Sequence, residues 1–201
     1  GNAIGGAAAG VRNVVSGNTG YGIHLINADG NVISGNYVGT NAAGTAALGN
    51  AAGIILEAGS TGNIIGGTAP GARNVVSGNA GLPSGLPYVS FGIGLFSGSD
   101  SNLVQGNYIG LNLAGTVDLA NHVGVVLTGG AAGNLIGTDG NGVSDGTEGN
   151  VISGNTSQGV LVIDADNNRV AGNIIGLNAT GTAAVPNFDG VFLQLSSGNI
   201  I

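Results

Sequence analysis

Two groups of carboxylates are the only acidic residues whose spacing suggests chemistry. Asp164 and Asp166 stand two residues apart, so an extended backbone would place both on one side, where they could serve as general acid and base. The glycine-rich segment from Asp139 to Glu148 offers the flexible oxygen ligands that Ca²⁺ accepts. Its calcium candidates are Asp139, Asn141 and Asp145. The segment lacks the spacing of an EF-hand loop, and both groups are also interpreted as solvated turns, so we expect no cofactor.

The other reactive residue types do not form a pair of nucleophile and base. Cysteine and lysine are absent, which excludes a thiolate nucleophile, a cysteine metal site and a Walker A loop. His24 and His122 occupy different places in the repeat described below. Most serines belong to one repeated phrase, and a residue copied several times is expected to serve a turn. The sequence therefore predicts no catalytic residue.

The charge balance excludes one large class of partner. The chain has three arginines, ten acidic residues and a net charge of −7, so its surface would repel a polyanion. No apolar run approaches the ~20 residues needed to cross a membrane. We expect neither nucleic acid binding nor membrane insertion.

Aromatic residues gather at one place. Tyr88, Phe91 and Phe96 surround an insertion, Gly81 to Val89, that breaks an otherwise regular repeat. These three residues are the candidates for ligand binding, with glycans as the possible ligand. Neutral drift of the loop is an equally open explanation.

The whole chain is built from variants of the phrase Asn-Val-(Val/Ile)-Ser-Gly-Asn. The phrase stands at Asn13 to Asn18, Asn31 to Asn36, Asn74 to Asn79 and Asn150 to Asn155. Short apolar segments bounded by Gly and Asn are typical of strands. Repeats of this kind cannot bury their apolar faces alone and must stack on their neighbours. We therefore predict a single solenoid domain over residues 1–201.

Alignment of the repeats predicts coils of about thirty residues with an asparagine near each of three corners. The first column is Asn2, Asn31, Asn63, Asn102, Asn134, Asn168 and Asn199. The second column is Asn13, Asn41, Asn74, Asn112, Asn150 and Asn178. The third column is Asn18, Asn50, Asn79, Asn121, Asn155 and Asn187. Short coils alternate with long coils that contain a Gly-Thr, and stacked asparagines are expected to hydrogen-bond into ladders.

These features resemble the right-handed parallel β-helix repeats of the pectin-lyase-like superfamily. The resemblance implies an all-β fold of about six three-sided coils, with β-branched residues such as Ile33, Ile65 and Ile136 pointing inward. The same repeats build pectinases, tailspikes, adhesins and large bacterial surface proteins, so the resemblance does not imply one activity. The glycine- and asparagine-rich style is most similar to the long surface proteins.

The catalytic motifs of the superfamily are not matched. A polygalacturonase would need paired aspartates and a Gly-His-Gly, and neither motif occurs. A pectate lyase would need an arginine base beside calcium-binding carboxylates. Arg12 and Arg73 occupy equivalent places, but the third copy has Gly149 and no carboxylate recurs beside them. We interpret both arginines as outward solubilising groups and the chain as a protein without enzymatic activity.

Surface patterning suggests self-association. The outward position of one strand reads His24, Ile55, Gly94, Val126, Leu161 and Phe192, which predicts an exposed apolar stripe. A second stripe is predicted at Ala3, Val32, Ile64, Leu103, Leu135 and Ile200. The chain also starts and stops at one phase of the coil, without a predicted cap, as expected for a segment of a longer array or a stacking subunit.

The expectation from the sequence is a structural, extracellular β-helical module of a surface protein or filament. It would associate with itself end to end and possibly side by side. The alternative is a carbohydrate-binding adhesin, or a polysaccharide lyase or hydrolase, on the same fold. An enzyme would have to use Asp164, Asp166 or the segment from Asp139 to Glu148.

Overall fold

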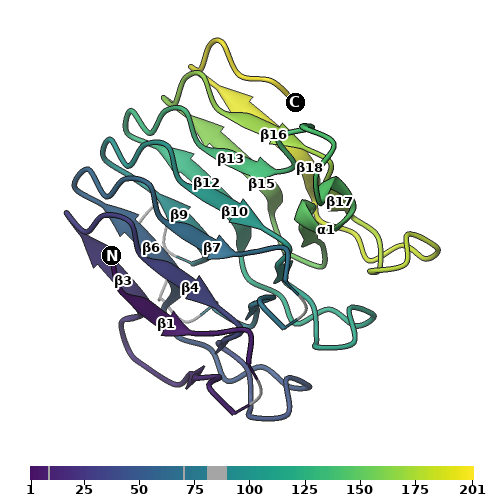
Figure 1. Cartoon of the computed structure of the whole chain (residues 1–201). Coiled ribbons are helices and arrows are strands. Elements are labelled where there is room, and N and C mark those ends of the chain that lie inside the picture. Colours follow the sequence, from purple (N-terminus) through teal and green to yellow (C-terminus); the bar gives the residue numbers. More distant parts are fainter. Residues whose placement is uncertain (9, 70, 81–89) are drawn as a thin grey trace.

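The chain winds into a three-sided parallel β-helix (Figure 1). The computed structural model describes residues 1–8, 10–69, 71–80 and 90–201. Successive turns lie side by side from the purple N-terminal end to the yellow C-terminal end, and each turn adds one strand to each of three sheets. This arrangement confirms the all-β fold, the three sides and the coil number expected from the repeats. The insertion at Gly81 to Val89, and with it Tyr88, lies outside the described residues.

Within the described residues each sheet has six parallel strands. The first sheet contains β1 (Ala3–Gly5), β4 (Val32–Ser34), β7 (Ile64–Gly66), β10 (Leu103–Gln105), β13 (Leu135–Gly137) and β16 (Arg169–Ala171). The second sheet contains β2 (Val14–Val15), β5 (Tyr37–Val38), β8 (Val75–Val76), β11 (Tyr108–Ile109), β14 (Val151–Ile152) and β17 (Ile174–Ile175). The third sheet contains β3 (Tyr21–Ile26), β6 (Ala52–Glu57), β9 (Phe91–Leu95), β12 (Val123–Thr128), β15 (Gln158–Ile163) and β18 (Asp189–Gln194).

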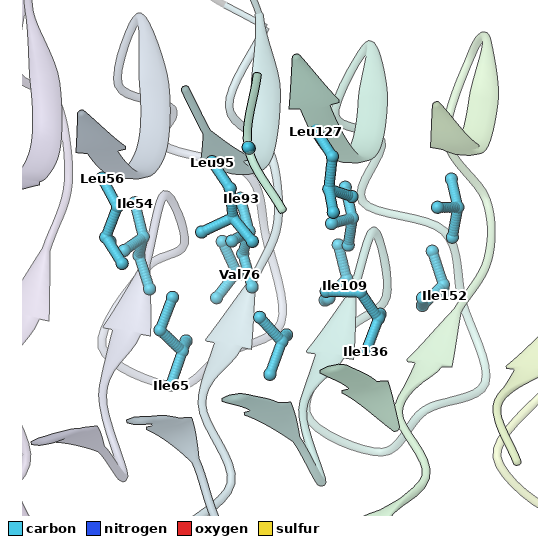
Figure 2. Packing of buried hydrophobic residues seen from close by; sticks show 14 of the residues in the cluster. Ile54, Leu56, Ile65, Val76, Ile93, Leu95, Ile109, Leu127, Ile136 and Ile152 are labelled. Carbon is cyan, nitrogen blue, oxygen red and sulfur yellow. The ribbon is translucent and has the colours of Figure 1, made fainter. Parts of the chain in front are cut away.

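The core consists of apolar columns that run along the axis. Strands pair without a shift in register, so like residues stack on like residues: Leu56 on Leu95, and Leu95 on Leu127. The three are fully buried and meet Ile65 and Ile136 of the first sheet in the interior (Figure 2). Burying each such side chain contributes about 1.5–3 kcal/mol. The predicted inward parity of the first-sheet residues is confirmed.

Asparagine side chains form a ladder along each of the three corners. The first ladder joins all seven residues of the predicted first column. The third ladder likewise joins all six residues of the predicted third column. At every step the side-chain Nδ2 donates to Oδ1 of the asparagine in the next coil, at 2.7–3.2 Å. In all steps but that from Asn121 to Asn155, the backbone N–H donates to the same oxygen, as Asn102 does to Asn134 at 2.9 Å.

The prediction of the second column was wrong in the long coils. Its ladder runs through Asn13, Asn36, Asn74, Asn107, Asn150 and Asn173, and not through Asn41, Asn112 and Asn178. The repeated phrase lies on the first sheet in long coils and on the second sheet in short coils. Its closing asparagine is therefore a rung of the second ladder in one case and of the third ladder in the other. Sequence alignment alone does not separate these two placements.

The three misassigned asparagines instead brace a hairpin in each long coil. Oδ1 of Asn112 accepts hydrogen bonds from the backbone N–H of Thr116 at 2.9 Å and Val117 at 3.2 Å. An antiparallel bridge from Leu111 to Asp118 closes the hairpin, and the other long coils repeat it. The N–H of Leu113 donates to Gly44 O of the previous hairpin at 2.8 Å. The hairpins thus form their own stack, with one member for every two coils.

The predicted apolar stripe on the third sheet is not exposed in the central coils. Ile55 and Val126 point outward, yet they are only 2% and 1% exposed. They form a second apolar cluster with Phe91, and the ring of Phe96 packs against it. The stripe is therefore buried in these coils, which the sequence pattern could not indicate. The stripe on the first sheet is half-buried in its middle and exposed at Val32 and Ile200.

We predict that the two kinds of asparagine differ strongly in their contribution to stability. Asn107→Ala removes the oxygen that accepts two hydrogen bonds from Asn74, and it leaves the buried carbonyls of Ile65 and Gln105 without its Nδ2 donor. The free energy of unfolding in urea should fall by roughly 3 kcal/mol or more, because buried polar groups lose their partners. The matched variant Asn112→Ala loses only partly exposed bonds and should cost about 1 kcal/mol. Equal losses for the two variants would contradict this assignment of the second ladder.

Candidate functional site

Asp164 and Asp166, the two carboxylates considered for acid–base chemistry, are part of a corner. Asp164 follows β15 with φ 51°, so the extended backbone on which the pairing depends is not present. Oδ1 of Asp166 accepts the backbone N–H of Ser197 in the next coil at 2.6 Å. Asp29 and Asp100 make the same contact, to Thr61 and Ala132, each at 2.8 Å. The repeat of this bond in every short coil identifies Asp166 as a structural cap.

The acidic loop brings three carboxylates together. Oxygens of Asp139, Asp145 and Glu148 lie within 4.8 Å of one another. Asn141, the third predicted calcium ligand, instead donates to Asp139 Oδ2 at 2.7 Å and uses its own Oδ1 to accept the N–H of Val143. The observed cluster thus contains Glu148 in the place that the sequence prediction gave to Asn141.

Glu148 is the residue that the choice of calcium candidates missed. It ends the four-residue helix α1 (Asp145–Glu148), where the sequence predicted only loop, and is 6% exposed. It stands two residues before Asn150, at the place where Ala72 precedes Asn74 in the preceding short coil. Ala72 is also buried. The equivalent residue of the first short coil is Val11, so a carboxylate at a position that is otherwise apolar was the available signal.

Arg12 and Arg73 are not simply solubilising groups. The guanidinium of Arg73 lies 3.9 Å from the ring centroid of Tyr108, and its Nε donates to Gly106 O at 3.1 Å. Arg12 repeats both contacts with Tyr37 and Gly35, at 4.0 and 3.1 Å. The arginines therefore cover the faces of two buried tyrosines from the second sheet, and neither ring is an open platform for a sugar.

The third two-coil unit lacks both members of this arginine–tyrosine pair. Gly149 stands in the place of the arginine, and Ile174 pairs with Val151 where tyrosine would lie. The acidic loop occupies the corner that the arginine covers in the earlier units. Loss of both partners in the same unit indicates that the cation and the ring form one structural element.

Among the remaining candidate residues, Phe91 and Phe96 contact each other, whereas His24 and His122 each have a different partner. Phe91 is 4% exposed, and its ring centroid lies 5.1 Å from that of the half-buried Phe96. His24 contacts Glu57, with 3.0 Å between Nε2 and Oε1. Nδ1 of His122 lies 3.1 Å from Thr156 Oγ1. The binding role proposed for Tyr88, Phe91 and Phe96 stays a prediction, since Tyr88 is outside the described residues.

Comparison with protein-family models, curated proteins and solved structures finds no match to this chain. The parallel β-helix and its asparagine ladders therefore rest on the geometry of the chain itself. Among the described residues, no helix has the length and apolar character needed to span a membrane.

We predict that the arginine–tyrosine contact stabilises the coil. Arg73→Ala should lower the free energy of unfolding by about 1–2 kcal/mol, since it removes a cation–π contact and a hydrogen bond. Arg169→Ala is the matched control, because the buried Nε of Arg169 has no hydrogen-bond partner in the described structure. Chemical denaturation should show a clear loss for the first variant and little change for the second. Equal losses would show that side-chain bulk, and not stacking on Tyr108, explains the effect.

We predict that electrostatic repulsion among the three clustered carboxylates lowers the stability of the chain in the absence of a divalent cation. Asp145→Asn should raise the free energy of unfolding in EDTA at low salt by about 1 kcal/mol, because one negative charge is removed. Asp118→Asn, a carboxylate outside the cluster, should have little effect. Thermal unfolding with and without CaCl₂ tests the calcium candidates: stabilisation of the parent chain that is lost in Asp145→Asn would support them.

Proposed function

We propose that this chain is a structural module of an extracellular surface protein or filament, related to the pectin-lyase-like β-helices. It works by stiffness and by stacking on further coils of the same kind. The observation that carries the proposal is the continuity of the three ladders, which pass through every coil without interruption. A ladder in which each amide between the first and last rungs accepts from one coil and donates to the next resists opening at any single coil.

The low content of charged residues and the packing of two arginines on tyrosine rings support a location outside the cell. The chain has no lysine, and Arg12 and Arg73 are held against tyrosine rings. Trypsin therefore has few sites to cleave, and two of them are tied to the neighbouring coil. Resistance to proteolysis is useful to a protein outside the cell, where unfolded segments are degraded.

The apolar surface of the last coil supports end-to-end association. Leu193 continues the column of Leu56, Leu95 and Leu127, which are fully buried, but is itself 41% exposed. A further coil on this face would bury it in the same way as its column partners. Burial of one leucine contributes about 1.5–3 kcal/mol, and the whole face would contribute several such side chains.

We predict that the purified 201-residue chain grows into filaments as its concentration rises. Light scattering should show increasing mass, and electron microscopy should show rods with a repeat of ~4.8 Å along the axis. Leu193→Glu should suppress growth because it places a charge on the stacking face. Leu48→Glu is the control, since Leu48 is exposed on the side of the rod. Single short rods at all concentrations, with the chain folded, would refute self-association.

A further inference from the structure

The ladders have a direction that runs from the first coil to the last. Each rung that is followed by another donates one Nδ2 hydrogen to the oxygen of the next coil, and every such rung except Asn121 also donates its backbone N–H, as Asn63 does to Asn102. In most rungs after the first coil, Nδ2 also donates to a backbone carbonyl of the preceding coil, as from Asn102 to Ser60 O at 3.0 Å. The oxygen of each rung therefore accepts only from the N-terminal side. No rung in the described ladders reverses this order.

This direction makes the two end faces chemically different. On the first coil, no described residue donates to Oδ1 of Asn2, Asn13 or Asn18, so this face presents a ladder oxygen at each of its three corners. On the last rungs, no described group accepts the backbone N–H of Asn199, Asn173 or Asn187. This face presents donors at the same three corners. We refer to them as the acceptor face and the donor face.

We infer that self-association is heterologous, with the acceptor face of one copy on the donor face of the next. This inference rests on the proposed self-association and specifies its geometry. Joining two acceptor faces would leave the ladder oxygens without the N–H donors that they accept in the described coils, and joining two donor faces would leave the ladder N–H groups without those oxygens. Only the mixed contact continues the ladders, and it leaves a free face at each end. Such contacts produce open filaments and not closed dimers.

One short segment must move for the ladders to continue without a gap. Ile200 already pairs with Arg169, so Asn199–Ile201 forms a seventh rung on the first sheet, whereas the other sheets have six strands. A second copy placed directly on the second and third sheets would bring its own Asn2 to Ile4 to that same position. The two three-residue segments compete for one place. Removal of residues 199–201 should therefore strengthen association.

The same chemical substitution should have opposite effects on the two faces. Asn187→Asp keeps the oxygen that accepts from Asn155 but removes Nδ2 with its bond to Ile152 O. The backbone N–H is then the remaining donor of this residue on the donor face, and a carboxylate is added beside it. Asn18→Asp also loses one internal donor, its bond to Asn50, yet it keeps acceptors on the acceptor face. The first variant should weaken association at least tenfold, and the second should leave it unchanged or tighter. Urea unfolding of both variants checks that their folds are equally stable.

Blocked chains give the decisive measurement. A folded domain joined by a short linker before Gly1 covers the acceptor face, and the same domain joined after Ile201 covers the donor face. We expect each blocked chain to be monomeric alone and an equimolar mixture to form a one-to-one complex in sedimentation velocity. If the parent chain associates and a blocked chain still dimerises alone, heterologous stacking is wrong while the proposed function stands. A parent chain that stays monomeric, also without residues 199–201, refutes both.

Equal weakening by Asn18→Asp and Asn187→Asp would likewise overturn the inference, because an interface independent of ladder direction has no reason to distinguish them. Weaker association after removal of residues 199–201 would overturn the proposed register. Stronger association with opposite effects of the two aspartates supports both the direction and the register.

Discussion

The need to satisfy bent, buried backbone at the corners governs this protein. At each corner the chain leaves one sheet and enters the next, so its N–H and C=O groups point away from the regular strand pairing. Asparagine can satisfy these backbone groups because its short side chain carries two donor hydrogens and an acceptor oxygen. Asn107 shows the full pattern: its oxygen serves the coil before it, and its Nδ2 serves both its own coil and its neighbours. The apolar columns can align only because these corners hold every coil in the same register.

With the corners fixed, the segments between them are free to differ. The corner that follows the first sheet carries an arginine on a tyrosine in two coils and a carboxylate cluster in the third short coil. The corner that follows the second sheet carries a hairpin in each long coil. The turns before the first ladder are closed by aspartates such as Asp166. The aspartate bonds and the arginine–tyrosine pairs join one coil to the next, the hairpins join one long coil to the next long coil, and the carboxylate cluster lies within a single coil.

The sequence predicted the architecture closely and the local chemistry poorly. Repetition and parity were enough for the sheets, the core and two of the three ladders, because strict repeats leave one way to bury the apolar positions. The second ladder was misassigned because the phrase has asparagine at both ends. Without knowledge of the hairpin, the sequence does not show that Asn36, and not Asn41, is the rung. Glu148 and the cover over Ile55 depend on contacts between segments far apart in the chain. Contacts of this kind leave no local pattern in the sequence, so they could not be predicted from it.

The chain length between consecutive rungs varies widely while the rung itself does not change. Along the second ladder, Asn13 and Asn36 are separated by 23 residues, whereas Asn107 and Asn150 are separated by 43. Doubling the length of a loop costs only about 0.6 kcal/mol in closure entropy. The ladder thus allows the outline of the cross-section to change while the stacking of the coils is kept. New segments can be inserted at a corner without altering the rungs on either side.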